Sequence, residues 1–408
     1  MTTKKTSIIK VALLSLLGLI LIAGVYYAPL IQRLYFSLNI EDEASMPENL
    51  RTLHQYYSTH LIESSATPQP FPRQLQENVL PESFQSHGET IKTKAFFTDA
   101  KPTGLVIIKD GQIIYENYWR GLTESDTQFA FSVAKSITSV LVGMAIGDGL
   151  INDVNDSVTK YLPHFKGSAW DKATIANTLE MSSGVEFDED YSRTDTDMRR
   201  FQMAYLFDKP MEDFLLSLKS NREPGISQGY NSMETQAAGF VIRSVIGERS
   251  LSNYMHEKLW QPLGAQDNAY WNVDGAGMEV AIGGLSMSLR DLAKIGQLYL
   301  QRGRWNGEQL IPESWVLEST TPSKPYQMPG RDNPLSEKPF GYGYLWWTPV
   351  DPNGREYYAS GLYGQYLFVN EDKGIVIAMY NANNNFNSAP DWWKERYEDF
   401  FQAIAQKY

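Results

Sequence analysis

The chain has 408 residues, 42% of them hydrophobic and 13% aromatic, which suits a large packed core and is unlike a disordered chain. Its formal net charge of -12 argues against nucleic acid as a partner, because phosphate binding needs a basic face. The absence of cysteine excludes thiol catalysis, disulfides, thiolate metal sites and an N-terminal lipid-modified cysteine.

The N-terminus contains an apolar run that predicts a membrane anchor. Residues 11–31 carry no charge, and a run of this length is long enough for a helix to cross a bilayer. Lysines precede the run and acidic residues follow it, so we expect the body to lie outside the cytoplasm. The prediction is a single-pass anchor at residues 1–33 in the cytoplasmic (inner) membrane, with the catalytic domain on the periplasmic side. A cleaved secretory signal is the alternative.

Residues 41 to about 90 are rich in Glu, Ser, Pro and Gln, and we predict that residues 34–90 form a linker and a peripheral segment packed on the body. The five histidines of the chain stand far apart, and there is no His-Glu-x-x-His motif. Nor does a glycine-rich loop lie between a strand and a helix. We therefore expect no metal, no nucleotide and no other cofactor.

Residues 91–405 have strand patterns at both ends and helical patterns between. A hairpin is predicted around Asp110-Gly111, and strand candidates follow at 341–347, 356–369 and 374–380. The intervening lobe, at about 160–284, is helical, and a closing helix is expected over 391–405. This order predicts an α/β fold of the α+β type, an antiparallel sheet flanked by helices and interrupted by an inserted all-helical lobe. A site is expected in the cleft between the two.

The stretch around Ser132 predicts a catalytic helix start. Apolar residues recur with helical spacing from Ile137 to Ala145, so Ser132 lies in the first turn and Lys135 on the same face. A partly desolvated lysine can take the proton of a serine hydroxyl, and the helix start offers unpaired N–H groups to an oxyanion. By itself Ser-x-x-Lys also occurs by chance, and such a serine is often only an N-cap.

A second serine, Ser227, lies in Gly225-Ile226-Ser227-Gln228-Gly229, which matches the Gly-x-Ser-x-Gly nucleophile elbow. An elbow follows a buried strand and opens a helix, whereas a loop pattern precedes this one. We interpret Ser227 as a chance match.

Three short motifs occur in order: Ser132-Val133-Ala134-Lys135, Tyr230-Asn231-Ser232 and Ala359-Ser360-Gly361. With them, residues 90–405 resemble the serine β-lactamase and penicillin-binding-protein superfamily, on its class C β-lactamase and esterase branch. Within that branch the chain looks most like the 6-aminohexanoate-dimer (nylon-oligomer) hydrolases.

The resemblance implies roles for the matching residues. Ser132 would be the nucleophile that forms an acyl-enzyme, and Lys135 would take or relay its proton. Tyr230 would protonate the leaving group and then activate the deacylating water. The backbone N–H groups of Ser132 and Leu362 would form the oxyanion hole. Which of Lys135 and Tyr230 is the first general base stays open.

The resemblance also implies substrate contacts, which we assign to Ser232, Ser360, Gly361, Tyr363 and Trp346. Ala359 departs from the family, because β-lactamases and transpeptidases have there a lysine that helps to bind the substrate carboxylate. Efficient turnover of β-lactams or D-Ala-D-Ala is therefore not expected.

The expected function is a membrane-anchored serine hydrolase, an esterase or amidase that cleaves a small ester or linear amide substrate. Two alternatives remain open: a penicillin-binding-protein-like D-alanyl peptidase or β-lactamase, and a sensor that is acylated by cell-wall fragments without turnover. An intact Ser132, Lys135 and Tyr230 favour turnover.

Overall fold

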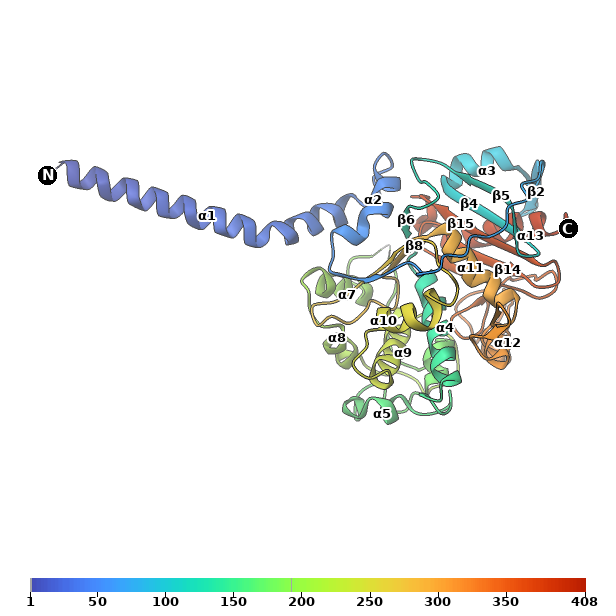
Figure 1. Ribbon diagram of the computed structural model, residues 1–408. Coiled ribbons are helices and arrows are strands. Elements are labelled where there is room, and N and C mark those ends of the chain that lie inside the picture. Colours follow the sequence, from blue (N-terminus) through green and yellow to red (C-terminus); the bar gives the residue numbers. More distant parts are fainter. Residues whose placement is uncertain (1, 192) are drawn as a thin grey trace.

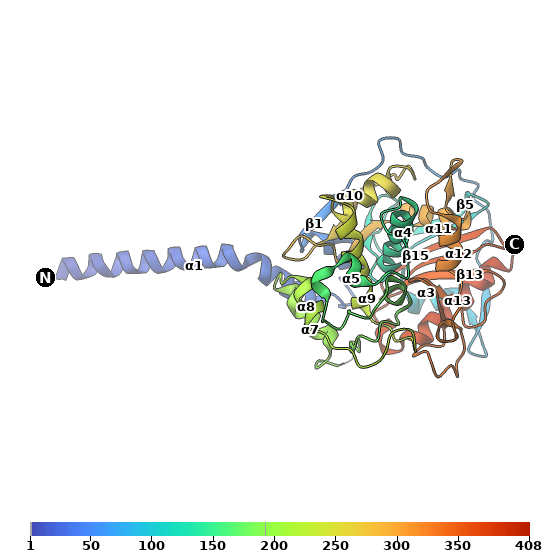
Figure 2. The ribbon, with the colours of Figure 1, turned by 90° about the horizontal axis from the view of Figure 1, so that it is seen from below.

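The computed structural model describes residues 2–191 and 193–408, with the backbone alone at 2–12 and 20. One long helix, α1 (Thr2–Asn39), projects from a body in which a sheet region adjoins a helical lobe (Figure 1). Figure 2 shows the same projection from a second direction. The mixed α/β architecture confirms the expected fold class, with antiparallel sheets flanked by helices.

The largest sheet has seven strands in the order β11-β12-β13-β14-β15-β4-β5, and all its neighbours are antiparallel. A four-stranded sheet, β1-β7-β8-β6, and two short hairpins, β2-β3 and β9-β10, complete the strands. The bounds are β1 Thr59–Ile62, β2 Ser83–Ser86, β3 Glu89–Lys92, β4 Pro102–Lys109, β5 Gln112–Tyr118, β6 Thr127–Phe129, β7 Ala269–Asn272, β8 Leu285–Ser288, β9 Arg304–Trp305, β10 Glu308–Gln309, β11 Gly341–Tyr342, β12 Trp347–Thr348, β13 Glu356–Gly361, β14 Gln365–Asn370 and β15 Ile375–Asn381.

The helices follow the sequence patterns closely, and the closing helix begins one residue before its expected start. Short 3₁₀ turns (η1 Leu53–Gln55, η2 Pro163–Phe165, η4 Pro325–Gln327, η5 Phe386–Ser388) and one π turn (η3 His256–Trp260) join them. The remaining bounds are α2 Met46–Thr52, α3 Thr93–Ala100, α4 Val133–Gly147, α5 Val158–Tyr161, α6 Ile175–Glu180, α7 Asp197–Leu206, α8 Met211–Ser217, α9 Ser232–Val245, α10 Leu251–Met255, α11 Leu289–Leu300, α12 Glu313–Ser319 and α13 Pro390–Ala405.

Helices pack on both faces of the seven-stranded sheet, and successive side chains of each strand point to opposite faces. Tyr366 and Phe368 of β14 pack their rings against Phe401 of α13. Leu367, between them, faces the opposite way and meets α11 at Gly296, where an added Cβ would lie 2.7 Å from Leu367 Cδ1. This close approach explains a glycine in the middle of a buried helix.

The sequence prediction of one strand over 356–369 was wrong in detail. The chain turns at 362–364, where Tyr363 and Gly364 have left-handed φ angles of 62° and 88°. The segment therefore forms the hairpin β13–β14, with Gly361 opposite Gln365. The turn leaves the end of β13 beside α4, the helix that begins directly after Ser132 and packs against β13.

The peripheral segment is also more regular than a linker. Its strand β1 pairs with β7, which lies within the segment 160–284 that was expected to be all-helical, so the four-stranded sheet unites distant parts of the chain. The last turns of α1 join the same surface, where Arg33 forms an ion pair of 2.6 Å with Asp208. The Phe36 ring stacks on Tyr56 with centroids 4.3 Å apart.

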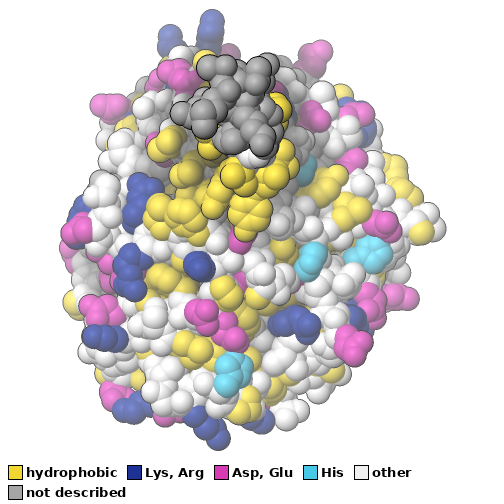
Figure 3. Space-filling view, turned by 90° about the vertical axis from the view of Figure 1, so that its left-hand side faces the viewer, with side chains coloured by type: hydrophobic (Ala, Val, Ile, Leu, Met, Phe, Trp, Pro, Cys, Tyr) yellow, Lys and Arg dark blue, Asp and Glu magenta, His cyan; other side chains and the backbone are white. Residues whose placement is uncertain are grey.

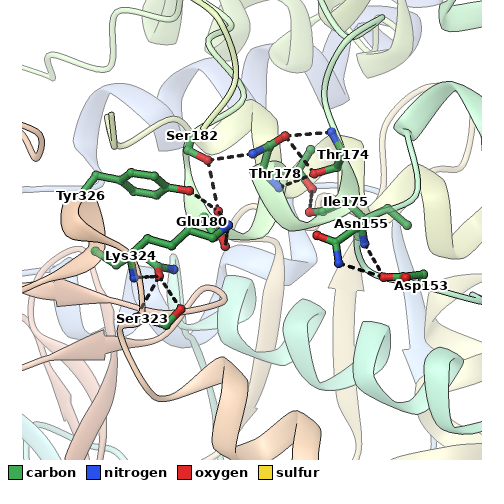
Figure 4. A network of polar contacts seen from close by, with 12 residues as sticks. Asp153, Asn155, Thr174, Ile175, Thr178, Glu180, Ser182, Ser323, Lys324 and Tyr326 are labelled. Atoms are coloured by element: carbon green, nitrogen blue, oxygen red, sulfur yellow. Dashed lines mark hydrogen bonds and ion pairs between the residues drawn. The ribbon is translucent and has the colours of Figure 1, made fainter. Parts of the chain in front are cut away.

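A buried carboxylate ties the helical lobe to the loop that follows α12 (Figure 4). Glu180, at the end of α6, accepts hydrogen bonds from Lys324 Nζ at 2.6 and 2.8 Å and from the Tyr326 hydroxyl at 2.7 Å. At the other end of α6, Thr174 and Asn177 form a reciprocal capping box. These contacts hold α6 of the helical lobe against the loop that follows α12.

Candidate active site

A cavity of about 610 Å³ lies between the helical lobe and the end of β13. Its lining brings together residues far apart in sequence, among them Ser132 before α4, Tyr230 before α9 and Leu362 after β13. The three sequence motifs therefore meet at one place.

Ser132 is held at the start of α4 by a strained turn. Phe131, directly before it, has a left-handed φ of 48°, which is costly for a bulky residue and concentrates at functional sites. Ser132 occupies the N-cap position, but its side chain forms no capping hydrogen bond. The hydroxyl is therefore available to other partners, which distinguishes it from an ordinary N-cap serine.

Lys135 is that partner. Its Nζ lies 2.9 Å from Ser132 Oγ and donates to the carbonyl oxygen of Ile282 at 2.8 Å. Burial lowers the pKa of Lys135 to about 8, although the negative charge of Glu189 acts in the opposite direction. A lysine with this pKa is partly neutral near physiological pH and can accept a proton.

Tyr230 covers the other side of the pair. The Lys135 ammonium lies 5.2 Å from the centroid of the Tyr230 ring, which stacks on Trp347 with centroids 5.5 Å apart. Burial raises the pKa of Tyr230 far above its ordinary value, the charge of Glu189 raises it further, and a hydrogen bond with Ser132 partly offsets both. The phenol is therefore protonated at neutral pH and suited to donate a proton.

The end of β13 approaches the turn before Ser132 closely. A Cβ on Gly361 would lie 2.4 Å from the carbonyl oxygen of Ala130, so only glycine lets the strand pass here. Within the described chain, the backbone N–H groups of Ser132 and Leu362 form no hydrogen bond with another group. Two unpaired N–H groups beside a serine can stabilise an oxyanion.

Of the expected substrate contacts, Ser360 and Gly361 line this cavity, whereas three other residues do not. Ser232 is buried, and its N–H and hydroxyl both donate to Glu189 at 2.7 Å, so it holds the start of α9 in place. Tyr363 faces an adjoining cavity of about 400 Å³ and donates to Glu41 at 2.7 Å.

The position of Trp346 differs most clearly from the sequence prediction, which made it a substrate contact. Its side chain is fully buried and packs against Tyr299, with ring centroids 4.4 Å apart. Trp346 precedes β12 and follows Leu345, whose left-handed φ of 62° turns the chain there, so the two tryptophans face different neighbours. The adjacent Trp347, and not Trp346, stacks on Tyr230.

The structure adds three residues that the motifs do not reveal. Glu189 accepts a hydrogen bond of 2.9 Å from the Tyr191 hydroxyl, and both line the cavity that Ser132 and Tyr230 line. Lys394 reaches the same cavity from α13, with its ammonium 5.9 Å from the Tyr230 ring centroid. An acidic, polar loop and a lysine on an amphipathic helix carry no local signal that would have identified them.

Ser227 lies in a loop, as interpreted, and not at a strand-to-helix turn. The neighbouring Gln228 and Gly229 donate their N–H groups to Leu335 and Met181, and α9 begins only at Ser232. Among residues 2–191 and 193–408, no group of three His, Cys, Asp or Glu side chains could hold a metal ion.

Several known proteins are similar to this chain. A family model described as Beta-lactamase matches residues 99–398. The chain is 29% identical over 288 residues to the 6-aminohexanoate-dimer hydrolase of Paenarthrobacter ureafaciens, covering 68% of this chain and 71% of that protein. It is 24% identical over 179 residues to a protein of Escherichia coli (strain K12) provisionally described as a D-alanyl-D-alanine carboxypeptidase, covering 39% and 41% of the two.

Solved structures show the same fold. A Bacillus anthracis protein, provisionally described as a 6-aminohexanoate-dimer hydrolase, matches with a TM-score of 0.80 at 24% identity. The match covers 90% of this chain and 96% of that one. At this identity the likeness concerns the fold.

Proposed function

The chain belongs to the beta-lactamase family, and we propose that it is a membrane-anchored serine hydrolase that cleaves a small ester or linear amide through an acyl-enzyme on Ser132. The observation that carries the proposal is the buried Lys135 Nζ, 2.9 Å from Ser132 Oγ. A serine hydroxyl becomes a strong nucleophile only when a neighbouring base takes its proton.

In acylation, Ser132 Oγ attacks the carbonyl carbon of the substrate while its proton passes to neutral Lys135 Nζ. The negative charge that develops on the carbonyl oxygen is stabilised by the N–H groups of Ser132 and Leu362. The opposite pKa shifts of Lys135 and Tyr230 support this order. The lowered pKa lets Lys135 give up its proton more readily, whereas the raised pKa keeps Tyr230 protonated.

Collapse of the intermediate breaks the bond to the leaving group, which receives the phenolic proton of Tyr230. In deacylation the Tyr230 phenolate takes a proton from a water molecule, which attacks the acyl carbon. As the bond to Ser132 Oγ breaks, Lys135 gives its proton to Oγ, so the acid is released and the free Ser132 hydroxyl, neutral Lys135 and protonated Tyr230 are restored.

The membrane part of the proposal depends on α1, which is long and apolar enough to cross a membrane over Leu13–Asn39. The charge-free residues 11–31 span about 30 Å as a helix, close to the thickness of a bilayer core. Figure 3 looks toward this side and shows apolar side chains gathered around the helix, with charged ones spread over the rest of the face. Arg33, the positive residue after the apolar run, forms an ion pair with Asp208 of the body. The lysines before the run therefore form its positive flank, which the positive-inside rule places in the cytoplasm.

A D-alanyl peptidase is the second candidate, because one relative carries that provisional description. It predicts release of D-alanine from a D-Ala-D-Ala peptide, with the same nucleophile. A sensor without turnover would also be acylated at Ser132, but its acyl-enzyme would persist.

The proposal is tested by the intact mass of the full chain, in detergent, after exposure to a fluorophosphonate probe. A single adduct, present in wild type and Ser227→Ala but absent in Ser132→Ala, is the expected result. An adduct lost only in Ser227→Ala would move the nucleophile to the 225–229 loop. No adduct on any form would leave a non-catalytic binder.

Turnover is tested separately with 4-nitrophenyl acetate. We expect many turnovers in wild type and an accumulated acetyl-enzyme in Tyr230→Phe, which cannot pass the proton. An acetyl-enzyme that persists in wild type would favour the sensor.

A further inference from the structure

A second cavity, of about 400 Å³, adjoins the first cavity, which Ser132 and Tyr230 line. Four residues line both cavities: Asp190, Tyr191, Leu362 and Asn387. In the proposed function the N–H group of Leu362 belongs to the oxyanion hole. A substrate bound at Ser132 therefore has the entrance to the second cavity directly beside its carbonyl group.

Apolar side chains make most of the inner wall of the second cavity. The rings of Phe129, Phe131 and Tyr363 form a row, with centroids 4.7 Å apart in the first pair and 5.0 Å apart in the second. The other buried apolar residues of the lining are Leu53, Met198, Leu206 and Val280. The charged residues of the lining are exposed: Glu41, Asp190, Arg193 and Arg199. Such an interior fits an alkyl chain.

The end of the membrane helix forms part of this cavity. Ser37 and Leu38 of α1 line it, and so does Glu41, which follows the helix. Glu41 accepts hydrogen bonds from the Tyr363 hydroxyl at 2.7 Å and from Asn387 Nδ2 at 3.0 Å. The end of α1 is thereby tied to the residue that follows the oxyanion-hole N–H group.

The mouth of the second cavity lies where the body meets the bilayer. Leu38 and Met203 both line the cavity and are 83% and 43% exposed. Leu38 lies about 10 Å along the helix beyond the charge-free run 11–31, and the headgroup layer outside a bilayer core is about 5–8 Å thick. Apolar side chains gather around the helix on this face (Figure 3). The mouth is therefore close to the acyl chains of the membrane.

Asn272 places a polar group in the inner wall. Its side chain lines the cavity and is buried, and neither Nδ2 nor Oδ1 forms a hydrogen bond with a group of residues 2–191 and 193–408. The Tyr205 hydroxyl acts on this carboxamide electrostatically but lies outside hydrogen-bond geometry. An alkyl chain that reached Asn272 would separate it from water without offering a hydrogen bond. The carboxamide therefore limits the length of chain that the cavity favours.

We propose that the second cavity binds a linear alkyl chain on the acyl half of the substrate, and that this chain enters from the bilayer at the end of α1. Tyr230, the proton donor to the leaving group, lines only the first cavity, so the acyl half is the one that extends past Leu362. The inference rests on the proposed function and narrows its substrates to membrane-resident esters or amides of medium-chain acids. The bond that is cleaved and the proton transfers are unchanged.

The acetate, octanoate and dodecanoate esters of 4-nitrophenol test this inference with the full-length protein in phosphatidylcholine vesicles. Each methylene that enters an apolar site should raise kcat/KM by up to about fourfold. Longer esters also concentrate in the vesicles. Each variant is therefore compared with wild type on the same ester, which cancels the partition of that ester.

Met203→Glu places a carboxylate at the mouth and should lower kcat/KM for the octanoate, relative to the acetate, by about tenfold or more. The matched control is Met328→Glu, at a position that is 40% exposed and outside both linings, and it should leave this ratio unchanged. Thermal unfolding of each variant shows whether it is folded.

Asn272→Leu replaces the polar group by an apolar one of similar size. It should raise kcat/KM for the dodecanoate, relative to the octanoate, by about tenfold. Because this variant gains activity toward one ester, a folding defect cannot produce the expected result.

The origin of the chain is tested with the dodecanoate in two arrangements. The ester is placed either in the vesicles that hold the protein or in separate vesicles, at the same total concentration. We expect a faster initial rate, before the ester exchanges between vesicles, when protein and ester share one bilayer.

Three results would overturn the inference. Met203→Glu could change kcat/KM for all esters equally, Asn272→Leu could leave the dodecanoate-to-octanoate ratio unchanged, or the initial rates could be equal in the two vesicle arrangements. Fluorophosphonate labelling separates these failures from a failure of the proposed function. If Ser132 is labelled normally, only the chain site is refuted, whereas absence of both labelling and ester hydrolysis refutes the proposed function as well.

Discussion

The burial of Lys135 predicts how the reactivity of Ser132 depends on pH. Transfer from water into the protein lowers the lysine pKa from 10.5 to about 8. Relative to a lysine in water, this shift favours the neutral amine by about 3 kcal/mol. At pH 7 about one lysine in ten is then neutral, compared with fewer than about one in a thousand for a solvated lysine. The enzyme thereby keeps a usable fraction of free base.

The assay is the rate of fluorophosphonate labelling of Ser132 between pH 6 and pH 10, because labelling needs no deacylation. We expect the rate to rise about tenfold per pH unit and to level off near pH 8. Lys135→Met should lower the plateau by about 10²–10⁴-fold and remove the rise. A midpoint near 10.5, or an unchanged rate in Lys135→Met, would refute the reasoning.

A charge variant sharpens this test. The carboxylate of Glu189 raises the pKa of Lys135, so Glu189→Gln should move the midpoint to lower pH. Glu186→Gln, an exposed change on the same segment, is the matched control and should leave the midpoint in place. A midpoint that does not move in Glu189→Gln would contradict the assigned cause.

Two further predictions concern positioning and stability. Gly361→Ala places a Cβ 2.4 Å from the Ala130 carbonyl oxygen. We therefore expect fluorophosphonate labelling of Ser132 to slow by about 10²-fold and the free energy of unfolding to fall by about 1–3 kcal/mol. Wild-type values in both measurements would contradict the close packing. His60 Nδ1 lies 2.9 Å from the buried Glu279 carboxylate, which raises the pKa of His60 above its ordinary value. The ionic part of this pair is fully present below about pH 6.5 and is lost as the pH rises through the raised pKa. Urea unfolding should therefore show a loss of about 1 kcal/mol from pH 6 to pH 9 that is absent in His60→Gln.

Local sequence signals were sufficient where one short segment determines its own structure. The Asp110-Gly111 turn joins β4 and β5, and the apolar stripe after Ser132 forms α4. The fold class followed from the order of such segments. The four-stranded sheet did not, because β1 and β7 are joined by more than two hundred residues of intervening chain, and no local pattern specifies that pairing.

Side-chain direction was the harder problem in the site. Trp346 and Trp347 are indistinguishable in sequence, yet only Trp347 stacks on Tyr230. Tyr363 was expected to face the substrate, but the left-handed turn after Gly361 directs its hydroxyl to Glu41. Both outcomes depend on the register of the sheet, which a short motif does not contain.

The electrostatics of the site bear on a point that the motifs left open, namely which residue is the first base. A single buried environment lowers the pKa of Lys135 and raises that of Tyr230, because burial disfavours the charged form of each. A base must be neutral and an acid must hold its proton before reaction, and these shifts prepare both states at once. The nearby Glu189 carboxylate raises both pKa values. It therefore limits the fall in the pKa of Lys135 and helps Tyr230 to keep its proton. We infer that Lys135 is the first base and Tyr230 the acid, and that the labelling profile of Glu189→Gln measures the balance between them.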